Sequence, residues 1–130
     1  MSSPIPASEI RSLAVDHGGV LWMVTGQGDL LKQARGAEAE KTDVRLGEER
    51  AKLRAVTAGE KGMLWLVAEG KGGKAVAGAW KIGETMLRVI DLEVEPRMLA
   101  WAKATKALWI VSTDTSLHVR AGGSMQAFGD

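Results

Sequence analysis

The residues that could carry chemistry in this chain of 130 residues are few and widely separated. His17 lies near the start and His118 near the end, and no spacing of His, Asp and Glu supplies the three or four ligands of a metal site. Ser and Asp occur without a nucleophile elbow or another ordered triad pattern. Cysteine is absent, which excludes thiolate chemistry and disulfides. The sequence therefore predicts no catalytic residue, no metal site and no enzyme.

Two glycine-containing stretches match phosphate-binding loops only in part. The Gly-Gln-Gly at 26–28 lacks the third glycine of a dinucleotide motif, and GKGGK at 70–74 lacks the Gly and the Ser or Thr that a phosphate loop needs at its ends. We interpret both as hairpin turns and expect no cofactor. Lys71 and Lys74 remain candidates for weak contact with an anion or a partner.

Charge and hydropathy limit the classes of binding partner and the cellular compartment that we expect for this chain. Lys and Arg total 17 and Asp and Glu total 16, a formal net charge of +1. The charged stretch 35–54 mixes both signs, which argues against a nucleic-acid groove. No apolar run approaches the roughly 18 residues that cross a bilayer, and the N-terminus lacks the pattern of a secretion signal. We expect a cytoplasmic protein with no nucleic-acid partner and no membrane insertion.

A Leu-Trp pair followed by β-forming residues occurs three times and sets the organisation of the chain. Its tryptophans, Trp22, Trp65 and Trp109, are 43 and then 44 residues apart. Periods of this length indicate arrays in which each unit packs only against its neighbours. A large apolar side chain recurring at one repeat position is typical of a structural core, and we assign these three residues to it.

Each repeat can be divided into four strands separated by Gly or Asp turns. Four antiparallel strands in about 43 residues predict an all-β fold of three β-propeller blades, a single domain with blades at 8–47, 51–93 and 95–130. In blade 1 the expected strands are 13–15, 21–25, 30–33 and 43–46. In blade 2 they are 55–58, the Leu-Trp strand, 79–82 and 86–92. In blade 3 they are 99–102, the Leu-Trp strand, 117–120 and 125–128.

A helical alternative exists for two segments. Residues 37–56 and 98–109 are rich in Ala, Leu, Lys, Glu and Arg, which favour helix. The register match with the first copy, where Gly18 and Gly19 would break a helix, favours strands. An α+β fold with one or two helices is the alternative.

The phrase AVDHGGVLWMVTGQGDLLKQ at 14–33 resembles tectonin-type propeller repeats and those of two-component sensor proteins. The shared pattern is an apolar strand, an Asp or Gly turn, Gly-x-Leu-Trp, two β residues and a Gly-containing turn. The third copy departs from it, because Lys106 stands where the other copies have Gly. The resemblance implies a propeller fold and, for the tectonin type, glycan binding.

Three blades alone would expose an apolar sheet face at each end of the arc. A homodimer would close six blades, and a different protein supplying the missing blades is the alternative. We also expect the N-terminal segment around Ile5 to complete the outer strand of the last blade.

Candidate binding residues are those that depart from the repeat or line the expected channel. Trp80 and Trp101 interrupt the repeat, and Trp101 is expected where the other copies have Ala14 and Thr57. Three arginines begin the inner strands and would ring one mouth of the channel, although the third fits only with a one-residue shift: Arg11, Arg54 and Arg97. The predicted function is a non-catalytic scaffold for protein–protein interaction. A tectonin-like lectin with repeated glycan sites is the alternative.

Overall fold

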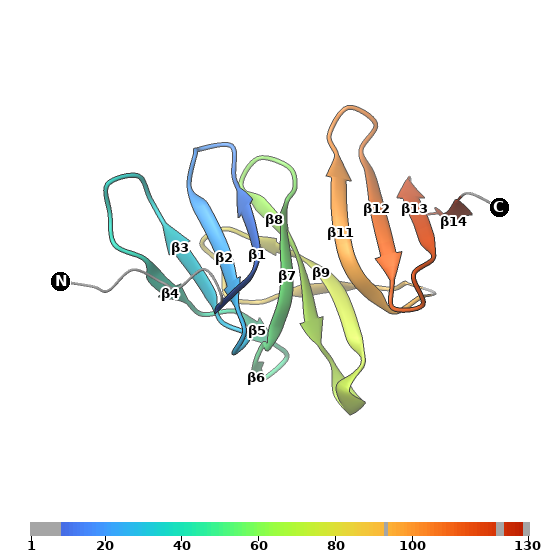
Figure 1. The fold of residues 1–130 in the computed structure, drawn as a ribbon, viewed down its shortest axis with the longest axis horizontal. Coiled ribbons are helices and arrows are strands. Elements are labelled where there is room, and N and C mark those ends of the chain that lie inside the picture. The colour runs from blue at the N-terminus through green and yellow to red at the C-terminus, as the bar shows by residue number, and fades with distance from the viewer. Residues whose placement is uncertain (1–8, 93, 122–123, 129–130) are drawn as a thin grey trace.

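The computed structural model describes residues 9–92, 94–121 and 124–128, and this part of the chain is built from antiparallel strands (Figure 1). Three four-stranded sheets follow one another along the chain, each a simple up-and-down meander. The prediction of an all-β chain is confirmed. The alternation of strands and turns explains it, because each short apolar strand ends at a Gly or Asp turn that reverses the chain.

The bounds of the strands are as follows. Sheet 1 contains β1 (Ile10–Val15), β2 (Leu21–Thr25), β3 (Leu30–Gln33) and β4 (Glu40–Thr42). Sheet 2 contains β7 (Leu53–Ala58), β8 (Met63–Glu69), β9 (Ala75–Lys81) and β10 (Arg88–Ile90). Sheet 3 contains β11 (Pro96–Ala102), β12 (Ala107–Ser112), β13 (Leu117–Ala121) and β14 (Ser124–Phe128).

The outer strand of sheet 1 lies earlier in the chain than predicted. It is β4, Glu40–Thr42, and not 43–46, because Val44 turns inward and is only 2% exposed in the core. The following residues form a separate two-stranded hairpin of β5 (Arg45–Leu46) and β6 (Glu49–Arg50).

The helical alternative is wrong for both segments. Strands and turns occupy 37–56 and 98–109, and neither segment contains a helix; the turn after β8 is a short 3-10 helix, η2 (Lys71–Gly73). Helix propensity is outweighed because the third Leu-Trp strand buries Leu108 and Ile110 against sheet 2. These two residues lie on one face of a strand, so both can pack there, whereas an isolated helix would not bury them in this way.

The third sheet shows two further corrections. Its fourth strand is β14, which pairs with β13, so sheet 3 does not require the N-terminal segment; that segment, around Ile5, lies outside the described residues. The β11–β12 hairpin is one residue longer than its counterparts, so Trp109 lies opposite Ala100 while Trp101 lies opposite Leu108. Trp101 is therefore equivalent to Val15 and not to Ala14.

The hydrophobic core lies in two seams between successive sheets. In the seam between sheets 1 and 2, Trp22 and Trp80 are each 1% exposed and meet edge to face with ring centroids 5.5 Å apart. In the seam between sheets 2 and 3, Trp65 meets Trp101 at 5.5 Å in a tilted arrangement. Trp22 and Trp65, the tryptophans of the first two Leu-Trp strands, thus each pack against the sheet that follows.

Candidate functional site

Each inner strand begins with the same irregularity, a β-bulge whose extra residue is an arginine. Ile10 and Ser12 of β1 are paired with β2, and Arg11 between them is not. Arg54 in β7 and Arg97 in β11 are skipped in the same way. A bulge redirects the side chain of its extra residue, so the three arginines share one repeat position and one backbone geometry.

A repeated backbone hydrogen bond holds this end of each sheet. The residue before each inner strand accepts, through its carbonyl, from a residue at or just after the end of the second strand: Gly26 N to Glu9 O at 2.8 Å, Glu69 N to Lys52 O at 2.8 Å and Thr113 N to Glu95 O at 3.0 Å. The third copy therefore follows the same frame as the first two. The one-residue shift expected for Arg97 is absorbed by the longer β11–β12 hairpin.

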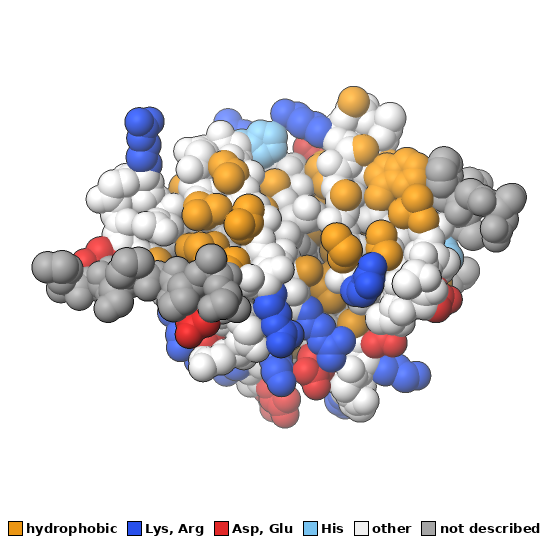
Figure 2. All heavy atoms as spheres, in the orientation of Figure 1, with side chains coloured by type: hydrophobic (Ala, Val, Ile, Leu, Met, Phe, Trp, Pro, Cys, Tyr) orange, Lys and Arg blue, Asp and Glu red, His pale blue; other side chains and the backbone are white. Residues whose placement is uncertain are grey.

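The three arginines lie at one end of the sheets, which we call the arginine edge. The loops joining the first two strands of each sheet lie along the upper side of Figure 1, so β1, β7 and β11 all begin along the lower side. Side chains of both charge signs gather there in the space-filling view (Figure 2). The arginine edge is thus a polar surface, in contrast to the apolar seams.

The arginines differ in how firmly they are held. Arg54 donates from Nη2 to the carbonyl of Gly73 at 3.1 Å and lies 3.5 Å from Glu69 Oε2. Arg11 and Arg97 are exposed, and within the described part of the chain neither forms an ion pair. Two guanidinium groups at the arginine edge are therefore open to an external anion.

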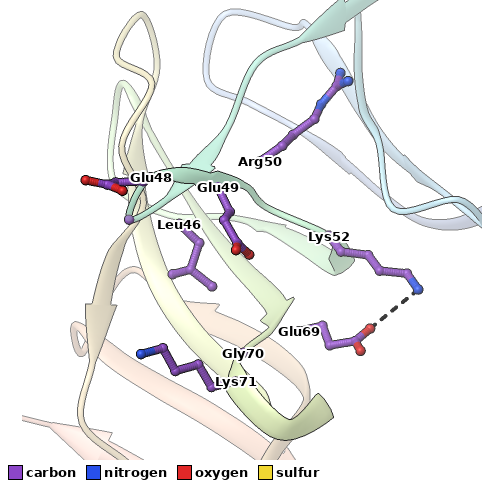
Figure 3. Close-up of a pocket in the computed structure, with 9 residues that line it drawn as sticks. Leu46, Glu48, Glu49, Arg50, Lys52, Glu69, Gly70 and Lys71 are labelled. Atoms are coloured by element: carbon purple, nitrogen blue, oxygen red, sulfur yellow. Dashed lines mark ion pairs between the residues drawn. The ribbon is translucent and has the colours of Figure 1, made fainter.

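A hollow of about 720 Å³ adjoins the arginine edge (Figure 3). It lies between the β5–β6 hairpin and the turn after β8, and it shares Glu69 with Arg54. Lys52 pairs with Glu69 at 3.6 Å on one side of the hollow, and Lys71 lines it together with Glu49 and Arg50. Lys71 thus lies at the arginine edge.

Lys74 follows the same turn and is exposed beside it. The turn depends on glycine, because Gly72 and Gly73 have φ values of 73° and 80° in the left-handed region. The prediction that this segment is a hairpin turn and not a phosphate loop is supported by its position between β8 and β9.

The two additional tryptophans occupy seams. Trp80 is 1% exposed against Trp22, so its assignment to a binding surface is wrong. Trp101 is partly buried against Trp65 and belongs to the seam between sheets 2 and 3. Among the repeated tryptophans, Trp22 and Trp65 are buried, while Trp109 is only half-buried on the side of sheet 3 that faces away from sheet 2.

The carboxylates with lowered pKa values have structural partners. Burial alone would raise the pKa of Asp16, but hydrogen bonds from Trp22 Nε1 at 2.9 Å and from the backbone N–H groups of Val20 and Gly18 bring it below its ordinary value. Hydrogen bonds from the hydroxyls of Ser112 and Ser116 lower the pKa of Asp114 to about 2. Asp16 and Asp114 therefore organise turns.

The two histidines contact neighbouring groups of the protein. His17 contacts the carbonyl of Gly59 at 3.2 Å, and His118 contacts Ser116 Oγ at 2.7 Å. The described residues contain no group of three or more His, Cys, Asp or Glu side chains that could hold a metal ion. In the same part of the chain, no helix is long and apolar enough to span a membrane.

The outward faces of sheets 1 and 3 form a second candidate surface. Leu13 and Val15 in β1 are 61% and 55% exposed, and Met98 in β11 is 53% exposed. Figure 2 shows two groups of hydrophobic side chains, one over sheet 1 and one over sheet 3, on the same side of the molecule. The sequence pattern indicated two apolar end faces, but it did not indicate that they point the same way.

Comparison with solved structures identifies the fold. The chain is similar to a gluconolactonase from Xanthomonas campestris, with a TM-score of 0.71 and 13% identity over 91% of this chain and 48% of that one. It is also similar to the WD40 domain of coronin from Toxoplasma gondii, with a TM-score of 0.61 and 17% identity over 89% of this chain and 33% of that one. Both are propeller-type folds.

The β-propeller prediction is therefore confirmed, and at these identities the likeness shows the fold alone. The chain spans about half the length of the gluconolactonase and a third of the coronin chain. No protein-family model and no curated protein matches the sequence.

Proposed function

We propose that this chain is a non-catalytic binding scaffold, a half-propeller that holds an acidic segment of a protein partner at its arginine edge. The observation that carries the proposal is the repeated bulge: three inner strands present an arginine at one position, Arg11, Arg54 and Arg97. Arginine suits this role because its planar guanidinium binds carboxylates through paired hydrogen bonds.

The surroundings of the arginine edge support a binding role. Arg54 is fixed by Gly73 and Glu69, while Arg11 and Arg97 project without an ion-pair partner in the described part of the chain. The adjoining hollow offers space for the side chains of an extended segment. The pattern thus combines a rigid platform with open charged groups, which fits a loop-and-edge binding surface.

A non-catalytic role is supported by how the perturbed groups are used. Asp16 and Asp114 have lowered pKa values, and carboxylates with shifted pKa values are candidates for catalytic groups. Their oxygens are engaged by turn residues and by Trp22, so they stabilise hairpins. The activity of the gluconolactonase belongs to that protein, and our proposal for this chain does not include it.

The proposal includes completion of the ring by a second copy. One chain contributes three four-stranded sheets, so two would contribute six. This chain covers 48% of the gluconolactonase, so two copies correspond to nearly the whole of that chain. In the closed ring the arginine edges of both copies would face one mouth of the channel. A different protein supplying the remaining sheets is the alternative, and no observation in the structure favours a glycan as the ligand.

The test uses a fluorescent hexaglutamate peptide and two matched double variants. Arg11→Gln with Arg97→Gln removes the open guanidinium groups, and Arg35→Gln with Arg88→Gln removes the same charge elsewhere. We expect the first variant to bind the peptide roughly tenfold more weakly, equivalent to about 1.4 kcal/mol, while the second changes binding less than about twofold. Binding should weaken as salt is raised.

Equal losses in the two variants would mean that only net charge matters and would remove the arginine edge as the site. A glycan array run on the unmodified protein covers the lectin alternative. Specific sugar binding that survives the Arg11→Gln and Arg97→Gln changes, together with no peptide binding, would replace the scaffold with a lectin.

A further inference from the structure

Both internal seams are built on a pair of tryptophans, whereas of the two open ends only that of sheet 3 has a tryptophan at the corresponding position. One member comes from the Leu-Trp strand of a sheet and the other from the sheet that follows: Trp22 with Trp80, and Trp65 with Trp101. The ring centroids are 5.5 Å apart in each pair. Aromatic pairs at this distance add to the stability of a seam beyond the area that they bury.

The second tryptophan of each pair occupies a defined place in its sheet. Trp80 in β9 lies opposite Leu64, and Trp101 in β11 lies opposite Leu108. Each therefore lies opposite the leucine of the Leu-Trp pair in its own sheet. Trp80 does so from the strand after the Leu-Trp strand, and Trp101 from the strand before it. In sheet 1 the residues that flank Leu21 are Val15 and Gln33, so sheet 1 offers no tryptophan at either place.

The outward face of sheet 1 is equivalent to a face that is buried in sheet 2. Leu13 lies opposite Met23 as Val56 lies opposite Leu66, so the two occupy one repeat position. Val56 is 5% exposed because sheet 1 covers it, and Leu13 is 61% exposed. The outward face of sheet 1 thus has the composition of a seam without the neighbouring sheet.

The outward face of sheet 3 is the complementary surface. Trp109 lies opposite Ala100 and next to Met98 on the side away from sheet 2, as Trp65 lies on the side of sheet 2 that sheet 3 covers. Figure 2 shows that the two apolar faces lie on the same side of the molecule. A second copy turned by a half rotation could therefore cover both at once.

We propose that the ring closes through two identical head-to-tail seams, in which sheet 3 of each copy places Trp109 against Leu13 and Val15 of the other. The occupant of the open faces is a second copy because the internal seams of this chain already join the same two kinds of face. The proposal rests on the ring closure in the proposed function and specifies its contacts. Such an interface leaves no open end when the rotation closes.

Sheet 1 brings no tryptophan to this closing seam, so we expect the closing seam to be weaker than the two internal seams. Val15 stands at the position that Trp101 fills in the seam between sheets 2 and 3. Val15→Trp should therefore place a tryptophan on sheet 1 at the position equivalent to Trp101, facing Trp109 across the closing seam, and tighten the dimer.

The experiment measures the dimer dissociation constant by sedimentation equilibrium on the whole chain from nanomolar to high micromolar concentration. We expect Val15→Trp to lower the constant by roughly tenfold or more, because two seams each gain an aromatic pair. Leu13→Asp should leave a folded monomer, since it places a charge in the closing seam while its position is exposed in the single chain. The control is Val89→Asp, at a position 46% exposed on β10, which should not change the constant.

The outcomes separate this inference from the proposed function. A dimer whose dissociation constant is unaffected by Leu13→Asp and by Val15→Trp would overturn the closing seam but leave ring closure in place. A monomer at every concentration, with circular dichroism of a folded β protein, would overturn ring closure itself. Peptide binding at the arginine edge is measured separately and can succeed or fail in either case.

Discussion

Asp16 shows how one side chain can organise a hairpin. Its carboxylate accepts hydrogen bonds from two backbone N–H groups in its own turn and from the indole N–H of Trp22, which is 1% exposed. The corresponding residue in sheet 2 is Gly59, and there the indole N–H of Trp65 has no hydrogen-bond partner among the described residues. The first copy of the repeat therefore carries a polar support that the second lacks.

Asp16→Ala should destabilise the protein by about 1–3 kcal/mol, because it leaves a buried indole donor without an acceptor. Urea unfolding at neutral pH measures the loss, and Asp43→Ala, at an exposed position, is the control. The pKa of Asp16 is lowered by folding, so its contribution is present above the unfolded-state pKa and is lost as pH falls through the folded-state value. The difference between the variant and the unmodified protein should shrink in acid; a constant difference would mean that the charge is irrelevant.

At the scale of the element, the last two strands of sheet 2, β9 and β10, approach each other closely at a glycine. Gly78 in β9 lies opposite Val89 in β10, and a Cβ at this glycine would lie 2.8 Å from the carbonyl oxygen of Arg88 and 2.9 Å from Leu87 Cδ1. Leu87 is 4% exposed in the core. The glycine thus allows β10 to approach β9 while Leu87 packs inward.

Gly78→Ala should therefore cost roughly 1–3 kcal/mol, the usual penalty for overpacking a tight site. The loss is measured as a shift of the urea midpoint at constant slope. Gly18→Ala is the matched control, since its Cβ would meet only Asp16 Oδ1 at an ordinary 3.4 Å. Similar midpoints for the two variants would show that β10 can move away without loss of packing.

The bulges at the starts of β1, β7 and β11 place the arginines of the proposed binding site. Each interrupts the ladder at an arginine and is anchored by the backbone hydrogen bond from the end of the second strand. The repeat therefore duplicates a candidate binding position together with its scaffold. This is the feature by which a short chain could present several equivalent charged groups.

At the scale of the whole molecule, the chain has an apolar face at each end of its arc. These faces carry Leu13, Val15 and Met98, each more than half exposed. Contiguous apolar surface of this kind usually marks an interface. In the proposed ring, stability would depend on the concentration of the chain as well as on its internal seams.

The melting temperature should therefore rise with protein concentration, because dimerisation stabilises only the folded state. Calorimetry over a hundredfold range of concentration measures the shift, and Leu13→Asp provides a reference whose melting temperature should not depend on concentration. A melting temperature that is constant for the unmodified protein would contradict self-association at these concentrations.

The strands and their repetition follow from local patterns in the sequence. Three Leu-Trp strands at 43- and 44-residue spacing, each bounded by Gly or Asp turns, are enough to predict antiparallel sheets, because strand period and turn chemistry are local properties. The same pattern placed Trp22 and Trp65 in the core. It failed at Val44, whose inward turn moves the outer strand of sheet 1, because burial there depends on sheet 2.

Which residues belong to the surface depends instead on how the sheets pack together. Trp80 looked like an exception to the repeat, but its neighbour across the seam, Trp22, buries it. The bulges that align Arg97 with Arg11, and the common direction of the two apolar faces, also depend on strand pairing and on the packing of one sheet against the next. The contact between Trp22 and Trp80 joins two different sheets, and the bulges depend on the register between paired strands, so neither can be deduced from one short stretch of sequence.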